Sequence, residues 1–300
     1  SSGPLPLDRG SISAAVMPNY AVRAGVTFPD WSGVTSPVAK EALLAMVGSD
    51  HVLNRWSGYS PAADRVRTAL LQLYAEDGRA PALDALARRA GLTAATVRPL
   101  LEGLKQRDLV VLAADGDRIL GAYPFTDRDA GHHVRLDGQT VNAMCAVDAL
   151  GIGAMVDRDI LIDSRCRHCG VPIQITTRDR GRTLATVEPH TSVVWLSVRY
   201  VGECAANSLC AATAFFCTDD HLATWRCERR SDEPGFRLSM DEALEVGQAI
   251  FGPSLARVST AGRHGENGAE ARNPSPPPGN PPSNGIPTAT RRLGANRRHG

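Results

Sequence analysis

Three segments decide how this chain folds: NAMCAVDAL (residues 142–150), SRCRHCGVPI (164–173) and NSLCAATAFF (207–216). The apolar run around Cys145 and Asp148 predicts a buried helix over residues 142–154. Residues three apart on a helix share one face, so a thiol and a carboxyl are expected to point the same way out of an apolar element. A buried carboxyl is costly unless it has a partner or a chemical task. The pair is therefore the first candidate functional site.

Composition and charge set limits on the class of protein. The 300 residues have a formal net charge of +1, so no global attraction to nucleic acid or to an anionic membrane is expected. No apolar run approaches the length of a membrane span, and residues 1–20 lack the pattern of a secretory signal, which favours a cytoplasmic location. The seven cysteines are odd in number, which argues against a disulfide framework.

The hydrophobic periodicity of residues 1–123 predicts two segments of different structure. Residues 1–60 are interpreted as an N-terminal extension with one short helix, which begins at Ser36–Pro37 and ends at Gly48. Residues 61–123 contain three helical segments followed by two short strands around an Asp-Gly turn, with Thr93 as the N-cap of the third helix. This order predicts a winged-helix-like domain.

Such a domain often binds DNA through its third helix. The basic residues here are sparse, and Pro99 interrupts the candidate recognition helix, which favours a packing or dimerising role over DNA binding. The basic residues in question are Arg88, Arg89, Arg98, Lys105 and Arg107.

Residues 124–256 predict a mixed β-sheet with flanking helices, which makes the chain an α+β protein. Residues 124–140 are expected to be a turn-rich joint, with His132 and His133 as surface polar residues rather than a metal pair. Beyond it the pattern predicts a final helix with Ser239 and Glu242 at capping-box spacing. The predicted strands are residues 158–164, 171–177, 182–189, 191–201 and 210–218, and a short helix is predicted over 221–229. Residues 257–300 are predicted to be a disordered Pro/Gly/Arg tail.

Three motifs together resemble the alkylmercury lyase family. They are Cys145-Ala-Val-Asp148-Ala-Leu, then Ser164-Arg-Cys166 with Gly-Val-Pro at 170–172, and Cys210 ahead of Phe-Phe at 215–216. The final helix, with Glu-Ala at 242–243 and Gly-Gln at 247–248, is similar too. The resemblance covers roughly residues 61–255 and makes residues 124–256 the expected catalytic domain.

The resemblance implies that Cys145, Asp148 and Cys210 are the catalytic residues and the ligands of substrate and product mercury, and that Cys166 has a structural role. It implies an organomercurial substrate, no cofactor, and a mercuric reductase as the receiver of released Hg(II). Mercury is soft and prefers thiolates. Two thiolates weaken the carbon–mercury bond, and an aspartate can carry the proton to the departing carbon.

The sequence departs from the family pattern in ways that bear on the organic groups accepted. Alanines stand where the family often has a second cysteine and two histidines, at Ala211, Ala212 and Ala214. Met144 replaces an aromatic residue, and Cys169 is an addition.

Three alternatives remain open on the residues alone. Cys166-x-x-Cys169 has half the spacing of a zinc knuckle, but Cys204 and Cys210 are too widely spaced to supply the second pair. A redox-sensing pair fits these two cysteines equally well, and Cys217 and Cys227 are taken as bystanders. The rival function is a mercury- or thiol-responsive winged-helix DNA-binding regulator, against which Asp148 argues because a thiol sensor needs no proton shuttle.

Overall fold

The computed structural model describes residues 29–47, 55–56, 58–116, 118–201, 204–228 and 233–255. Most of the predicted N-terminal extension, Gly48 and the predicted tail lie outside these residues. Within them no helix is long and apolar enough to span a membrane. The helical elements are η1 (Trp31–Gly33), α1 (Pro37–Val47), α3 (Pro61–Asp77), α4 (Leu83–Ala90), α5 (Ala94–Gln106), α6 (Ala146–Val156), α7 (Leu209–Ala212), α8 (Asp219–Glu228), α9 (Met240–Phe251) and η2 (Gly252–Ser254).

Two antiparallel sheets carry the described strands. The larger has the order β1-β2-β3-β5-β4-β6-β7-β8, and the smaller has the order β10-β9-β11. The predicted α+β class is confirmed, and every pairing among these strands is antiparallel. The strands are β1 (Val110–Leu112), β2 (Ile119–Ala122), β3 (Phe125–Thr126), β4 (His133–Leu136), β5 (Gln139–Ala143), β6 (Leu161–Arg165), β7 (Pro172–Arg178), β8 (Thr183–Glu188), β9 (Val193–Ser197), β10 (Ala214–Phe216) and β11 (Gly235–Ser239).

The helices of the first half begin and end where their capping residues indicate. The side chain of Ser60 accepts a hydrogen bond from the backbone of α3, and that of Thr93 accepts one from Thr96 at the start of α5. Gly78 and Gly91 end α3 and α4 in the left-handed conformation that favours glycine. The predicted three helices and two strands are therefore all present.

The larger sheet continues across the predicted domain boundary between residues 123 and 124. Ala122 of β2 pairs with Phe125 of β3, and Phe125 pairs in turn with Ala143 of β5. The ribbon that follows α5 is thus hydrogen-bonded to the strands of the second half. The division into a winged-helix-like domain and a catalytic domain stays a prediction.

Residues 124–140 contain β3, β4 and the start of β5, so the prediction of a turn-rich joint was wrong. Asp137 and Gly138 both have positive φ (37° and 90°) and form the two-residue turn between β4 and β5. A turn of this kind matches the twist of paired strands. The alternating burial of Val134, Leu136 and Val141 supplies the apolar face of the hairpin. The abundant turn residues concealed this short alternation.

Three further boundaries differ from the predictions. Asn142 and Ala143 belong to β5, so the predicted helix over 142–154 begins at Ala146 instead. Residues 209–212 form α7, not the start of a strand, and β9 ends at Ser197 rather than continuing to residue 201. In the first two cases a pairing partner decides the outcome: Asn142 pairs with His133 and Thr126, whereas residues 210–212 have no partner in β9.

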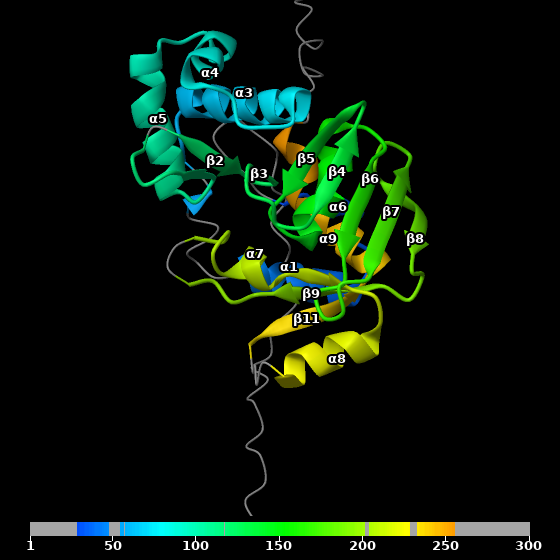
Figure 1. Cartoon of the computed structure of the whole chain (residues 1–300). Helices are drawn as coiled ribbons and strands as arrows, with labels where there is room; N and C mark the ends of the chain where they lie inside the picture. Colours follow the sequence, from blue (N-terminus) through cyan, green and yellow to red (C-terminus); the bar gives the residue numbers. More distant parts are fainter. Residues whose placement is uncertain are drawn as a thin grey trace, which may run out of the picture. The chain divides into compact units, whose positions relative to one another are not determined.

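Helices α6 and α9 form the layer behind the larger sheet (Figure 1). They cross at Gly151 and Gly247, where a Cβ on Gly247 would lie 2.8 Å from the backbone nitrogen of Gly151. Ten of the eleven residues of α6 are buried, as its continuous apolar sequence predicts. The predicted capping box of Ser239 and Glu242 starts α9. The close crossing fixes the position of α6, whose first turn carries Cys145 and Asp148.

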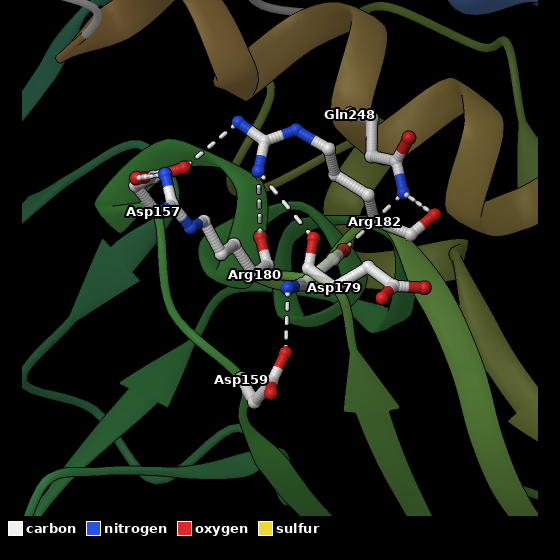
Figure 2. Close-up of polar contacts among 7 residues, drawn as sticks. Asp157, Asp159, Asp179, Arg180, Arg182 and Gln248 are labelled. Carbon is white, nitrogen blue, oxygen red and sulfur yellow. Dashed lines mark hydrogen bonds and ion pairs between the residues drawn. The ribbon is translucent and has the colours of Figure 1, made fainter.

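A polar network ties the C-terminal end of α6 to the β7–β8 turn and to α9 (Figure 2). Asp157 accepts hydrogen bonds from Arg180 (3.0 Å) and Arg182 (2.8 Å). The backbone N–H of Gly181 donates to Asp159, and Gln248 of α9 donates to the carbonyl oxygens of Gly181 and Arg182. Gly181 has no room for a side chain, since a Cβ there would lie 2.3 Å from the backbone of Gly153.

Candidate active site

Cys145 stands at the N-cap of α6, with an extended backbone at the end of β5. Its sulfur accepts a hydrogen bond from the backbone N–H of Asp148 at 3.4 Å. Cys145 is therefore the N-cap of α6 and Asp148 lies in its first turn. The two residues do not share one face of a helix, contrary to the prediction from their spacing. An N-terminal end of a helix favours a negative charge, which suits a thiolate at this position.

Cys210 lies in α7, between β9 and β10. Its backbone N–H donates to the carbonyl oxygen of Ala205 at 2.8 Å, so the preceding turn holds it in place. The sulfur of Cys210 lies 3.6 Å from Oδ2 of Asp148, in the geometry of a thiol that donates to a carboxylate.

The turn before Cys210 is anchored by a buried carboxylate that sequence reasoning missed. Asp108, at a positive φ of 55° just after α5, accepts hydrogen bonds from the hydroxyls of Tyr123 and Tyr200 (2.9 Å each) and from the backbone N–H of Ala205 (2.8 Å). The hydroxyl of Tyr123 accepts one from the backbone N–H of Ala206. A lone Asp in an Arg-Asp-Leu turn gave no signal of this role.

The sulfurs of Cys145 and Cys210 and a carboxylate oxygen of Asp148 all lie within 4.8 Å of one another. The structure thus brings together the three predicted site residues. Metal–thiolate bonds of about 2.3 Å, the length known for zinc, let one metal atom between two sulfurs span about 4.6 Å. A single soft metal atom can therefore contact both thiols beside the carboxyl.

Burial sets the protonation of this group. Cys145, Asp148 and Cys210 are 2%, 4% and 4% exposed. Desolvation raises the pKa of Asp148 to about 7. The hydrogen bonds with Cys145 and Cys210 favour the charged carboxylate and act to lower this pKa, but their effect is smaller. Desolvation also raises the pKa of Cys145. The hydrogen bond to Cys145, together with burial, raises the pKa of Cys210 well above its usual range. The two thiols are held protonated beside a carboxyl that titrates near neutrality.

A cavity of about 60 Å³ adjoins the three groups. Its wall is mainly apolar, and the polar exceptions besides the site itself are Arg67, Tyr123, Tyr200 and Ser254. Arg67 is buried, donates to Ser254 at 3.3 Å and leaves its Nε without a hydrogen-bond partner. The apolar lining residues are Met46, Trp56, Leu109, Val147, Leu196, Ala205, Leu209, Ile250 and Phe251.

The other singled-out residues lie elsewhere. Cys166 is buried in a second group, with Cys169, Cys217 and His221. His132 is buried, contrary to its prediction as a surface residue, because its ring nitrogen Nδ1 lies 2.8 Å from the hydroxyl of Ser164.

Comparisons with known proteins show what this chain is similar to. Residues 125–252 match the sequence profile of the family described as alkylmercury lyase. The chain is 26% identical to an alkylmercury lyase of Bacillus cereus over 182 residues, which cover 60% of this chain and 78% of the relative. It is 29% identical to one of Streptomyces lividans over 156 residues, 52% and 69% of the two chains.

A crystal structure of the mercury-bound form of MerB2 shares the fold, with a TM-score of 0.57 and 23% identity, and the match covers 73% of this chain and all of the other. The family match over residues 125–252 includes the strands and helices that carry Cys145, Asp148 and Cys210. Residues 125–252 thus carry the similarity of this chain to the alkylmercury lyases.

Proposed function

We infer that this protein is an organomercurial lyase, which cleaves a carbon–mercury bond by protonolysis to release a hydrocarbon and Hg(II). The observation that carries this inference is the convergence of Cys145, Asp148 and Cys210 beside an apolar cavity. Two thiols suit a soft metal, and the apolar wall suits an alkyl or aryl group. The site residues, their roles and the absence of a cofactor are part of the proposal, with mercury as substrate and product.

In the first step, the thiol of Cys145 loses its proton and its sulfur bonds to mercury, displacing the ligand X of an R–Hg–X compound as HX. Cys145 is suited to this step because the N-terminal end of α6 and the N–H of Asp148 favour its thiolate. The organic group then lies on a mercury atom held by one sulfur.

In the second step, Cys210 passes its proton to Asp148, across the 3.6 Å contact, and its thiolate becomes the second mercury ligand. Asp148, now protonated, donates that proton to the carbon as the carbon–mercury bond breaks. The sum is R–Hg–X plus two thiols giving R–H, HX and mercury bound by two sulfurs. A carboxyl with a pKa of about 7 is able both to accept and to donate this proton near neutral pH.

The test is the conversion of phenylmercury by the full chain in a thiol-containing buffer, with benzene and Hg(II) both quantified. We expect equimolar benzene and Hg(II) from the wild type and neither from Cys145→Ala. A matched control is Cys204→Ala, since Cys204 is a neighbouring thiol outside the triad, and this variant should remain active. Full activity in Cys145→Ala would overturn the assignment of the residues, and an inactive wild type would overturn the function.

The rival DNA-binding function finds less support in the helices of the first half. Arg89 makes two hydrogen bonds to Glu76 (2.9 and 2.6 Å), Lys105 pairs with Glu102, and Arg107 donates to the backbone of Arg55. Cations engaged within the protein contribute less to phosphate binding. We propose that this winged-helix-like part packs against the catalytic strands and does not contact DNA. A gel shift with duplex DNA at low salt tests this, and binding there would revive the regulator. The mercuric reductase partner and the cytoplasmic location stay predictions.

A further inference from the structure

A second group of metal-ligating side chains lies outside the proposed active site. Cys166 and Cys169 occupy the turn between β6 and β7, Cys217 follows β10, and His221 lies in the first turn of α8. One atom from each of the four residues lies within 4.8 Å of the others: three sulfurs and one imidazole nitrogen. The predicted half-site, Cys166-x-x-Cys169, thus finds a partner pair, Cys217-x-x-x-His221, of which Cys217 was expected to be a bystander.

The separations suit a tetrahedral zinc ion. With Zn–S bonds of about 2.3 Å and Zn–N bonds of about 2.0 Å, two sulfurs of a tetrahedron lie about 3.8 Å apart, and a sulfur and a nitrogen about 3.5 Å apart. The Cys169 and Cys217 sulfurs lie 3.7 Å apart. Nδ1 of His221 lies 3.8 Å from the Cys166 sulfur and 2.9 Å from the Cys217 sulfur. Small side-chain adjustments would place all four atoms around one ion.

The backbone of the β6–β7 turn brings N–H groups to the sulfur of Cys166. The N–H of Gly170 donates to the carbonyl oxygen of Cys166 at 2.9 Å, and Gly170 has a φ of 74°, where glycine is favoured. Backbone N–H groups of His168 and Cys169 are directed at the sulfur of Cys166. Such contacts orient a thiolate ligand and offset its negative charge.

The burial of the four residues indicates a structural rather than a catalytic site. Cys166 and Cys217 are buried, His221 is half-buried, and Cys169 is exposed and offers a path for an ion to enter. Four protein ligands complete a tetrahedron and leave no position for a substrate, which is typical of structural zinc. The soft, mixed set of three sulfurs and one imidazole also excludes Mg²⁺ and Ca²⁺, which prefer oxygen.

We propose that Cys166, Cys169, Cys217 and His221 bind a structural Zn²⁺ ion that joins the larger sheet to the β10–α8 segment. The ion would reinforce a contact already present, the hydrogen bond from the N–H of Arg167 to the carbonyl oxygen of Phe215 at 3.0 Å. Because β10 follows α7, the ion would fix the segment that carries Cys210 from its C-terminal side. Nothing in the proposed lyase reaction uses these four residues, so the two proposals stand independently.

The experiment measures zinc in the purified, reduced full chain by elemental mass spectrometry. A Cys145→Ala/Cys210→Ala background removes the two active-site thiols. We expect about one zinc ion per chain. Co²⁺ exchanged for zinc in the same chain should give the intense visible absorption of a tetrahedral thiolate site. A chain that contains no zinc and gives no such band with Co²⁺ would overturn the proposal, as would iron in place of zinc.

Substitutions identify the ligands. Cys217→Ser and His221→Ala should each lose the metal or weaken its affinity at least tenfold in competition with a chelating dye. His168→Ala is the matched control, because its ring lies near that of His221, with centroids 5.0 Å apart, yet it is not one of the four ligands. Cys227→Ser controls for an exposed thiol outside the group. Unchanged zinc affinity in Cys217→Ser, or loss of zinc in His168→Ala alone, would contradict the assignment.

Discussion

The thiol of Cys210 lies 3.6 Å from the carboxyl of Asp148, although 62 residues separate them in the sequence. Two packing features produce this contact. The crossing of α6 and α9 fixes Asp148, and the hydrogen bonds of Asp108 fix the turn that precedes Cys210. The proton path proposed above depends on both, so each can be tested separately.

Asp148→Asn should make the protein far less active but more stable at alkaline pH. Burial raises the pKa of Asp148 from 3.8 to about 7, so the native carboxyl holds a proton that the unfolded chain releases near pH 4. The free energy of unfolding is therefore not reduced by this carboxyl below pH 4, and the reduction is complete once the pH has risen through 7. At 1.36 kcal/mol per pKa unit, the substitution should increase the free energy of unfolding by up to about 4 kcal/mol at pH 8. Urea unfolding at pH 4 and pH 8 measures the difference, and an equal effect at both values would contradict this origin.

The same carboxyl should control the pH dependence of catalysis. Asp148 accepts the proton of Cys210 only as a carboxylate, so kcat/KM for a phenylmercury substrate should increase as the pH rises through about 7. Cys145 and Cys210 contact this carboxyl, and Arg67 and Tyr123 line the same cavity. Initial rates measured between pH 5 and pH 9 would show this increase. Asp148→Asn should reduce the rate about 100- to 10,000-fold and should abolish the increase near pH 7. A wild-type profile that is flat from pH 5 to pH 8 would exclude this role.

Tyr123→Phe should loosen the turn before Cys210 more than Tyr200→Phe does. Both hydroxyls donate to Asp108, but the hydroxyl of Tyr123 also accepts from the N–H of Ala206. A buried group left without its partner costs about 1–3 kcal/mol. Hydrogen exchange at the amides of Ala205 and Ala206 measures the opening. Exchange as slow as in the wild type in both variants would show that the Asp108 network does not hold this turn.

Gly247→Ala should destabilise the protein by about 1–3 kcal/mol, the usual cost of overpacking. The new Cβ would meet the backbone of Gly151 at 2.8 Å and the carbonyl oxygen of Val147 at 2.8 Å. Gly103→Ala is the control, since Gly103 lies inside α5 with no atom within 4 Å of an added Cβ. It should stabilise the protein by about 0.4–1 kcal/mol. Thermal unfolding of both variants compares them, and a neutral Gly247→Ala would show that α6 and α9 can separate freely.

The sequence was informative where a local signal coincides with the structure. Thr93, Ser239 and Glu242 cap helices as their spacing predicts, and the apolar run of α6 is buried. The motif around Cys145 and Asp148 also identified two members of the candidate site. The predicted geometry of this pair was wrong: Cys145 is the N-cap of the helix, and its sulfur accepts a hydrogen bond from the backbone N–H of Asp148.

The remaining features depend on contacts that no local pattern encodes. Cys217 and His221 join Cys166 only when β10 lies beside β6, and no spacing in the sequence shows that pairing. Asp108 receives its three hydrogen bonds from residues up to 97 positions away. The short strands β3 and β4 form because neighbouring strands supply their hydrogen bonds, which outweighs the weak strand signal of a segment rich in turn residues.

The central claim is that both sulfurs must bind one mercury atom before the carbon–mercury bond breaks. Native mass spectrometry after one equivalent of phenylmercury, with benzene measured in the same sample, tests it most directly. A Cys204→Ser/Cys227→Ser background removes two thiols outside both metal-ligating groups. We predict that this chain carries mercury without the phenyl group, with one benzene released per chain, and that adding Cys210→Ala leaves phenylmercury bound and intact. Release of benzene by the Cys210→Ala chain at the parent rate would contradict the account.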